Sequence, residues 1–435
     1  RRARAGRGRR RRAPLSPRRV VVVGGGFAGL HLIRRLDGRL RRGEAEITLV
    51  DRNNYHLFTP LLYQVATGEL PAHAVAYPLR RVAARAGFQF RQSEVEAIDV
   101  EARLVRTADG PLPYDHVVVA PGSVTNDYGI AGVREHALAV KSLADAHAVR
   151  RRILAAFERA AIEGDLAKRR ALLAFVLIGA GPVGVELASS MRDLMDHTLR
   201  PMYPQLDFAR DITIVLMDGA DRVLPQMDER LARIALRRLE QQRVRVVLRA
   251  PVSEVGRGAV RTRDGARFDG ATIVWAGGVK VSPLVAALPL PRAKDGRLAV
   301  DATFRVGGRD DVLCFGDAAS FEHRGGPLPQ LAQVAVLQAP TVARNLARLV
   351  RGEPLAAYHH RPKGDLVALG RTNAGAQMRQ LFGIPVGDIV IAGLPAWTVW
   401  RANYLMQLLG VRNRATLLME WTLSYFFSRM VADTP

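Results

Sequence analysis

The chain has 435 residues, of which 48% are apolar and 24% are charged, a composition typical of a folded protein with two or three domains. Its single cysteine, Cys314, excludes a disulfide framework and a redox-active cysteine pair, and its ten histidines stand in no HExxH or CxxC context, so no metal site is predicted. No run of 18 apolar residues exists, so no helix is expected to span a bilayer. Any redox chemistry must therefore come from an organic cofactor.

The formal charge of +23 is concentrated partly at the N-terminus, where residues 1–19 hold 10 Arg and no acid. We predict a disordered basic arm there, either an extension without a role of its own or a transit or membrane-touching segment. Of the 64 basic residues 59 are Arg, which indicates a GC-rich genome as much as selection for phosphate. Because no nucleic-acid-reading motif accompanies the charge, no nucleic-acid partner is predicted.

The first chemical signal follows the apolar run VVVV at residues 20–23, which predicts a buried parallel strand. Gly24, Gly26 and Gly29 then form a G-x-G-x-x-G turn before an apolar helical stretch, and the strand ITLV ends in Asp51. Glycines permit a tight turn and close backbone approach, the helix start faces a pyrophosphate, and the acid suits a ribose. This combination predicts a dinucleotide-binding unit. Further on, residues 114–123 predict a strand that ends in a turn of small residues, suited to passing close under a flat cofactor.

A second unit repeats this pattern. The strand LLAFVLIG precedes Gly179, Gly181 and Gly184, and the strand ITIVLMD ends in Asp218. Asp218 stands 34 residues past Gly184, so residues 192–210 are predicted to be an inserted helix and loop. The strand ATIVWAGG closes the unit, which makes the chain an internal repeat.

Glu186 lies two residues past the last glycine of the second turn, and we expect it in the first turn of the following helix. It is either an acid favoured by the positive helix end or a group with a functional role.

Two later segments complete the pattern. Near residue 316 a short apolar strand ends in Gly316-Asp317, which would lie at the ligand-binding edge of an open sheet. The last 80 residues predict a hairpin and two helices of about 15 residues that carry Trp397, Trp400 and Trp421 among basic residues. We expect these helices to be interfacial membrane anchors, a dimer interface or a packed pair, and more than one can hold.

The two units and the late GD pair outline the glutathione-reductase-like fold: an α/β protein with two Rossmann-like dinucleotide-binding domains plus a C-terminal hairpin and amphipathic helices. More specific stretches resemble type II NADH:quinone oxidoreductases, the non-pumping respiratory enzymes. They are DRNNYHLFTPLLYQVATG (51–68), VWAGGVK (274–280), KGDLVALGR (363–371) and LLGVRNR (408–414). The resemblance runs from about residue 20 to residue 430.

This resemblance implies FAD in the first unit and NADH in the second. The FAD residues would be Gly24, Gly26, Gly29, Asp51, Phe58, Thr59, Pro60, Ala120, Gly122, Asp317 and Ala332, and the NADH residues Gly179, Gly181, Gly184, Asp218 and Gly277. Glu186, Gln333 and Lys363 would be catalytic: Glu186 beside the nicotinamide, Gln333 near the quinone entrance, and Lys363 near the flavin unless it is only a solvated loop residue. Asp218 predicts NADH over NADPH, although Arg222 is close enough in sequence to weaken that preference.

The predicted organisation is a basic arm (1–19), an FAD domain in two segments (20–140 and 291–355), an NADH domain (141–290) and a membrane-anchoring region (356–435). The partners implied are a quinone, a membrane surface and a second copy of the chain, at the cytoplasmic face of the inner membrane. Leu337 stands where the family often has a second Gln, with Gln338 one residue later, which weakens a Gln-based quinone clamp. The rivals are a soluble NAD(P)H-dependent FAD reductase, a sulfide:quinone-type enzyme, disfavoured by the lone cysteine, and a nucleotide-sensing regulator.

Overall fold

The computed structural model describes residues 16–41, 43–381, 384–427 and 429, and the chain divides into two compact units. Unit 1 comprises the chain up to His56 together with Pro78–Ser123 and Val281–His360, and unit 2 comprises Leu57–Tyr77, Val124–Lys280 and the chain from Arg361 onward. These boundaries differ from the predicted domains chiefly at residues 57–77 and 124–140. Residues 57–77 group with unit 2 because helix α2 (Leu62–Ala66) packs against α6 (Leu143–Ile162) and α8 (Pro182–Leu194).

The predicted arm extends two residues too far. Its residues 1–15 lie outside the described residues, but strand β1 (Arg18–Val23) already includes Arg18 and Arg19. The backbone N–H of Arg19 donates to Asp115 at 2.7 Å, which fixes this end of the strand.

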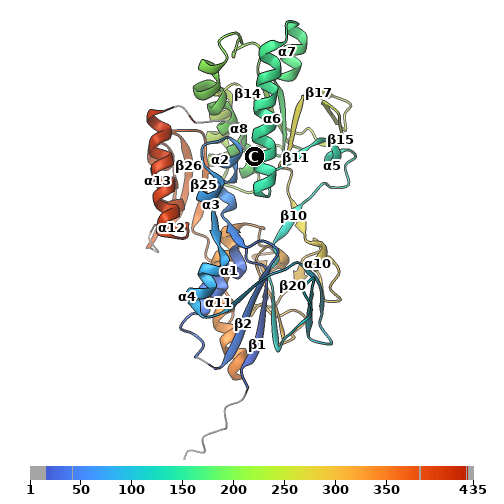
Figure 1. Ribbon diagram of the computed structural model, residues 1–435, viewed down its shortest axis with the longest axis vertical. Coiled ribbons are helices and arrows are strands. Elements are labelled where there is room, and N and C mark those ends of the chain that lie inside the picture. The colour runs from blue at the N-terminus through green and yellow to red at the C-terminus, as the bar shows by residue number, and fades with distance from the viewer. Residues whose placement is uncertain (1–15, 42, 382–383, 428, 430–435) are drawn as a thin grey trace, which may run out of the picture. The chain divides into compact units, whose positions relative to one another are not determined.

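The core of unit 1 is a five-stranded parallel sheet in the order β21-β9-β1-β2-β5. Helices α1 and α11 pack against each other in this unit (Figure 1). The apolar runs of β1 and β9 fill one cluster, in which Val21, Val23 and Val117 are at most 2% exposed. The remaining bounds are α1 (Phe27–Leu36), β2 (Ala45–Asp51), α4 (Leu79–Ala86), β5 (Gln89–Gln92), β6 (Val95–Asp99), β7 (Leu104–Thr107), β8 (Leu112–Pro113), β9 (His116–Val119), α10 (Pro283–Ala286), β20 (Leu298–Ala299), β21 (Val312–Cys314), β22 (Ala319–Ser320), β23 (Glu322–His323), β24 (Gly326–Pro327) and α11 (Ala332–Arg351).

Unit 2 repeats this plan with the parallel sheet β11-β18-β12-β13-β14. In each unit the Gly-rich turn follows the central strand, β1 or β12, and the acid-bearing strand lies beside it. Each unit also carries a three-stranded antiparallel sheet, β6-β7-β8 or β15-β16-β17. The bounds are α3 (Ala72–Val75), α5 (Val133–His136), β11 (Leu138–Ala139), α7 (Leu166–Leu172), β12 (Ala174–Ile178), β13 (Thr213–Met217), α9 (Glu229–Gln241), β14 (Val244–Val247), β15 (Val252–Gly256), β16 (Ala259–Thr262), β17 (Arg267–Asp269) and β18 (Thr272–Trp275). The predicted internal repeat is confirmed.

The insertion predicted at 192–210 continues the preceding helix instead of forming a separate one. Helix α8 runs on into a π-helical turn (Met195–Leu199) and a 3-10 turn (Arg200–Met202) before the chain enters β13. Short 3-10 turns also cover Thr59–Leu61 and Gly316–Ala318. Four short strands stand next to unit boundaries in the sequence: β3 (Tyr55–Leu57), β4 (Ala76–Pro78), β10 (Ser123–Thr125) and β19 (Val279–Val281).

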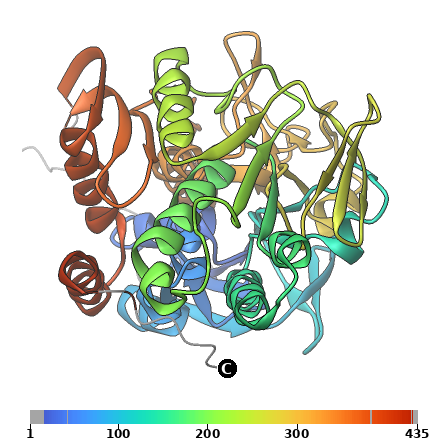
Figure 2. The ribbon, with the colours of Figure 1, turned by 90° about the horizontal axis from the view of Figure 1, so that it is seen from above.

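The C-terminal part of unit 2 is an antiparallel sheet followed by two helices, coloured orange to red in Figure 2. Its elements are β25 (Gly364–Ala368), β26 (Ala374–Leu381), β27 (Ile384–Gly393), α12 (Leu394–Gln407) and α13 (Val411–Phe426). Helix α12 packs on β26 and β27 and also on α13, so this region is an integral layer of the unit. Among the described residues, no helix combines the length and hydrophobicity that a membrane crossing requires.

Candidate functional site

The first Gly-rich turn has the geometry of a dinucleotide cradle. Gly24 has φ +104° and lies directly against the carbonyl of Ala120, so any side chain there would strike backbone. Gly29 lies equally close to the carbonyl of Gly24 at the start of α1. At Gly26, in contrast, a Cβ would meet nothing within 4 Å. The turn is therefore closed on its protein side and open at the position where a pyrophosphate would approach the helix start.

Asp51 is tied to this turn. Its carboxylate accepts from the N–H of Gly25 at 2.6 Å and from the N–H of Asn53 at 2.7 Å. Burial raises the pKa of Asp51, and these two hydrogen bonds act in the opposite direction. The carboxylate thus holds the turn in shape and keeps further lone pairs for a ribose hydroxyl.

The second turn reproduces this geometry. Gly179 has φ +108° and lies against the backbone of Ala276 and Gly277, and Gly184 lies against the carbonyl of Gly179. A Cβ on Gly181 would again meet nothing within 4 Å. Asp218 accepts from the N–H of Ala180 at 2.6 Å and from that of Ala220 at 2.8 Å. The residues present in both turns therefore fit a dinucleotide.

The remaining predicted FAD residues that belong to unit 1 line the C-terminal ends of its strands. Ala120 follows β9, and Gly122 has φ +74° with open space at its Cβ position. Asp317 follows β21 and accepts from the hydroxyl of Ser123 at 2.6 Å. Ala332 and Gln333 open helix α11. This edge of the sheet is where open α/β folds bind their ligands.

Two residues at this edge were not predicted. His56 is 3% exposed, its Nδ1 lies 3.1 Å from the carbonyl of Gly25, and burial lowers its pKa to about 4, so the ring is neutral and donates to that carbonyl. Gln338 accepts from the N–H of Gly316 at 2.8 Å and is 1% exposed. The side-chain oxygen of Gln338 is therefore engaged inside unit 1.

Glu186 lies differently from its prediction. Helix α8 begins at Pro182, so Glu186 stands in the second turn of the helix. The prediction that Glu186 lies in the first turn, where the positive helix end would favour its charge, is therefore wrong. The side chain points into unit 2, where it is 6% exposed and accepts from the N–H of Ala368 at 3.0 Å. Burial raises the pKa of Glu186 to about 8, against the effects of Ala368 and of the Trp400 indole, which lies nearby without reaching hydrogen-bond geometry. The carboxyl group is therefore protonated at neutral pH.

Aromatic residues of α2 and α12 surround this acid. Tyr63 and Tyr404 are both buried, and burial together with the charge of Glu186 raises their pKa values above the usual range of a tyrosine. Tyr404 makes edge-to-face contacts with Trp400 at 4.7 Å and with Phe58 at 5.7 Å between ring centroids. Phe58 and Glu186, two predicted site residues, are thus brought to one aromatic cluster. Thr59 and Pro60 form the 3-10 turn that follows Phe58.

The aromatic cluster corrects one expectation. Trp400 and Trp421 are each 1% exposed, and their rings lie 5.6 Å apart at an interplanar angle of 45°, so they pack within unit 2 and are not interfacial anchors. The sequence could not separate these alternatives, because an aromatic helix face suits a core and a membrane surface equally. Lys363 is exposed ahead of β25 and accepts through its carbonyl from Arg379. Cys314 is buried, and burial raises the pKa of its thiol.

The described residues contain no group of three or more His, Cys, Asp or Glu that could hold a metal ion. Two dinucleotide cradles of matching geometry, each with its own acid, define the class: oxidoreductases that pair a flavin dinucleotide with a nicotinamide dinucleotide. The family model of pyridine nucleotide-disulphide oxidoreductases matches residues 18–339.

The chain belongs to this family and, within it, to the type II NADH:quinone oxidoreductases. It is 32% identical to a protein of that name from Mycobacterium tuberculosis, over 94% of this chain and 89% of the relative. It is 30% identical to one from Staphylococcus aureus, over 85% of this chain and 91% of the relative. The structure of NDH2 from Plasmodium falciparum in complex with NADH shares the fold, with a TM-score of 0.84 at 18% identity over 95% of this chain and 99% of that one.

Nucleotide choice is the first testable consequence. We expect kcat/KM to favour NADH over NADPH by about tenfold or more, because the Asp218 carboxylate repels a 2′-phosphate. Arg222 does not oppose this effect, since it donates to the carbonyls of Pro225 and Met227 in its own loop. Steady-state kinetics with both nucleotides tests the expectation, and Asp218→Asn should narrow the ratio. Equal kcat/KM values for the unmodified chain would contradict it.

Proposed function

We propose that this enzyme works at a membrane surface, with Glu186 as the acid that supplies a proton to the reaction. The reaction is that of the family: NADH, a proton and a quinone give NAD⁺ and a quinol. FAD, when bound, takes up the two reducing equivalents of NADH and passes them to the quinone. The observation that supports this function best is the repeated cradle, in which Asp51 and Asp218 each accept from a turn N–H at 2.6 Å.

The chain's own residues divide the work. We assign the FAD dinucleotide to the turn of Gly24, Gly26 and Gly29 with Asp51, and the NADH dinucleotide to Gly179, Gly181 and Gly184 with Asp218. Hydride transfer brings only one of the two hydrogens that a quinone needs, so one proton per turnover must come from solvent. Glu186 is buried and protonated, which is the state required of a proton donor. Gln333 and Lys363 remain predicted contacts of the quinone and the flavin.

A stepwise spectroscopic experiment tests the function. The purified protein should carry a yellow flavin, lose that absorbance when NADH is added without oxygen, and regain it when a short-chain quinone follows. Bleaching without reoxidation by any quinone would support the nucleotide-sensing alternative. Reoxidation by a small redox protein but not by quinone would support the soluble reductase.

The membrane contact is assigned to helix α13 and the residue after it. Several large apolar side chains are exposed there: Val411, Leu418, Met419, Leu423, Phe426 and Phe427. Phe426 is 78% exposed and Phe427 is 66% exposed, which is costly in water and suited to a lipid surface. We also propose the homodimer predicted from the sequence, and light scattering in detergent tests it, with a monomer as the contradicting result.

Replacing Phe426 and Phe427 together by Ser should weaken partitioning onto lipid vesicles. Burying the two rings contributes about 3 kcal/mol, so the partition coefficient should fall roughly a hundredfold. Co-sedimentation with vesicles measures this fall. The matched control is Ile162→Ser with Leu166→Ser, two residues 88% and 56% exposed at neighbouring ends of α6 and α7. Equal losses in both double variants, or no loss in the first, would remove α13 as the contact. Deletion of residues 393–435 is a poorer test, because it would uncover the core that Trp400 and Trp421 fill.

A further inference from the structure

Glu186 is only 6% exposed and accepts from the N–H of Ala368, so its buried neighbours determine how a proton that leaves it is replaced. A small cavity lies beside it, with about 10 Å³ of space for the centre of a water molecule. Its lining includes Tyr63, Glu69, Ser190 and Ala368, the residue whose N–H binds Glu186. A space of this size holds one water molecule, provided that polar groups surround it.

The cavity walls supply these groups. Tyr63 contributes its hydroxyl, which also accepts from the Gln64 amide at 3.3 Å. Ser190 contributes a hydroxyl that lies 2.8 Å from that of Thr67. Trp400 also lines the cavity, and its indole N–H is buried and makes no hydrogen bond to another described residue. A water molecule would satisfy this N–H and could at the same time contact Tyr63 and Glu69.

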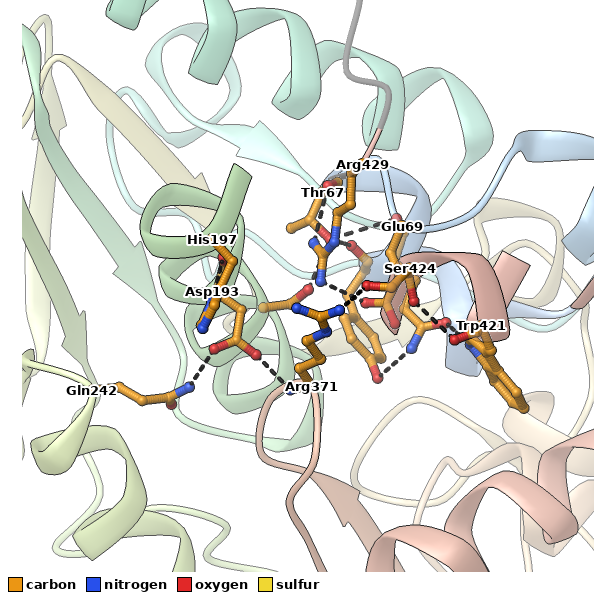
Figure 3. A network of polar contacts seen from close by, with 12 residues as sticks. Thr67, Glu69, Asp193, His197, Gln242, Arg371, Trp421, Ser424 and Arg429 are labelled. Carbon is orange, nitrogen blue, oxygen red and sulfur yellow. Dashed lines mark hydrogen bonds and ion pairs between the residues drawn. The ribbon is translucent and has the colours of Figure 1, made fainter. Parts of the chain in front are cut away.

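Glu69 forms the outer wall. It is 8% exposed, and its carboxylate accepts from Arg429 at 3.1 Å (Figure 3). Arg429 in turn lines a second hollow of about 140 Å³, whose other walls include His197, Arg371 and the exposed rings of Phe426 and Phe427. The exposed rings place this hollow at the surface of unit 2. The Glu69–Arg429 pair therefore separates a surface hollow from the cavity next to Glu186.

We propose that Glu69, one water molecule in the cavity and the hydroxyl of Tyr63 carry protons from solvent to Glu186. Glu69 takes a proton from the surface hollow and passes it to the water. The water gives a proton to the oxygen of Tyr63, whose own proton moves to the ionised Glu186. At the end Glu69, the water molecule and Tyr63 carry the same number of protons as at the start. Glu186 has gained one proton and is ready for the next turnover. This proposal rests on the proposed function, because only a proton-consuming reaction needs the route.

The surrounding charges are compatible with such transfer. Glu186 faces Tyr63 of α2, Tyr404 and Trp400 of α12 and the N–H of Ala368 in β25, with no cation among these partners. The charges of Glu186 and Glu69 both raise the pKa of Tyr63, and Tyr63 lines the same cavity as Glu69. Arg401 lines the cavity and disfavours a lasting hydronium ion there, so protons should pass by exchange. Arg429 also donates to the carbonyl of Thr67 at 3.3 Å, so it stays in place when Glu69 is protonated.

The test follows the proton on Glu186 itself. The protonated carboxyl of Glu186 should give an infrared C=O band, identified by its loss in Glu186→Gln. After the holoenzyme is mixed with D₂O, the rate at which this band shifts reports the arrival of deuterons. Tyr63→Phe, which removes only the hydroxyl, should slow this exchange by about a hundredfold. Glu69→Asp should exchange close to the unmodified rate, because it keeps a carboxylate.

The role of the Glu69 carboxylate is tested with a variant that leaves no unpaired buried charge. Glu69→Gln alone would strand Arg429, so Glu69→Gln with Arg429→Gln removes both charges and keeps a polar pair. This double variant should slow exchange as much as Tyr63→Phe. The matched control is Tyr203→Phe, a buried tyrosine of the same unit that loses a hydrogen bond to Glu158 away from the cavity. It should leave exchange unchanged.

Failure of the proton route and failure of the proposed NADH:quinone activity give different results. Exchange at the unmodified rate in Tyr63→Phe or in the double variant would overturn the route, and so would equal slowing in Tyr203→Phe. Flavin bleaching by NADH consumes no solvent proton, and it should be unchanged in Tyr203→Phe, the variant that lies outside the route. An unmodified protein that NADH fails to bleach would defeat the proposed function, whatever the infrared band does.

Discussion

Glu186→Gln should lower quinone-linked turnover by about a hundredfold, the lower range of a general acid's contribution. The amide preserves the shape of the side chain and keeps an oxygen to accept from Ala368, but it cannot release a proton at neutral pH. Stopped-flow bleaching by NADH and steady-state quinone reduction measure the two halves of the reaction separately. We expect the second half to slow more than the first, and unchanged turnover would remove Glu186 from the mechanism.

The same variant has a stability signature. The pKa of Glu186 is about 8 in the folded chain and 4.5 as an ordinary glutamate, so the folded state binds more protons between these values. The contribution of Glu186 to stability is therefore full below pH 4.5 and is lost as pH rises to about 8. Across this window it changes the free energy of unfolding by about 1.4 kcal/mol per pH unit. Urea unfolding at several pH values should show a weaker fall with pH in Glu186→Gln, and equal slopes would contradict the buried, protonated state.

Gly181→Ala should abolish useful NADH binding while the apoprotein stays folded. A Cβ at this position meets no protein atom within 4 Å, so the fold can accept it. It would stand where the pyrophosphate approaches the helix start, and losing that approach should weaken NADH binding by about a hundredfold or more. Thermal unfolding without nucleotide and NADH titration by fluorescence measure the two effects.

Gly184→Ala provides the contrast within the same turn. Its Cβ would collide with the carbonyl of Gly179, so we expect a lower melting temperature even without nucleotide. Gly26→Ala in the first cradle should instead yield a folded protein that retains less FAD. If Gly181→Ala unfolds the chain, or binds NADH as tightly as the unmodified protein, the assignment of the second cradle is wrong.

The structure shows which aromatic residues of the C-terminal helices are buried and which are exposed, and the composition does not. The aromatic residues of the C-terminal helices form two groups. Trp400 and Trp421 fill the core near Glu186, and Phe426 and Phe427 remain exposed. Arg371 links helices α8 and α13, because its backbone N–H donates to Asp193 of α8 and its guanidinium donates to the carbonyl of Ser424 in α13 (Figure 3). A substitution that loosens α13 should therefore affect both membrane binding and the surroundings of Glu186.

The sequence by itself determined the two cradles. Gly24 and Gly179, with their positive φ angles, and Asp51 and Asp218, at the ends of apolar strands, act within segments of about 40 residues, where local spacing dictates geometry. The repeat, the succession of strand, turn, helix and acid-ending strand, and the two C-terminal helices followed from the same local patterns. The family stretches then fixed the reaction class.

Only the tertiary structure decided what surrounds Glu186. Tyr63 precedes Glu186 by 123 residues, and Ala368 and Tyr404 follow it by 182 and 218 residues, so no local pattern pairs them with it. The pKa of Glu186 depends on this burial, since desolvation acts only when distant segments close around the carboxyl group. The Glu69–Arg429 pair and the burial of Trp400 could not be predicted for the same reason. Contacts between remote segments arise from packing, which sequence spacing does not encode.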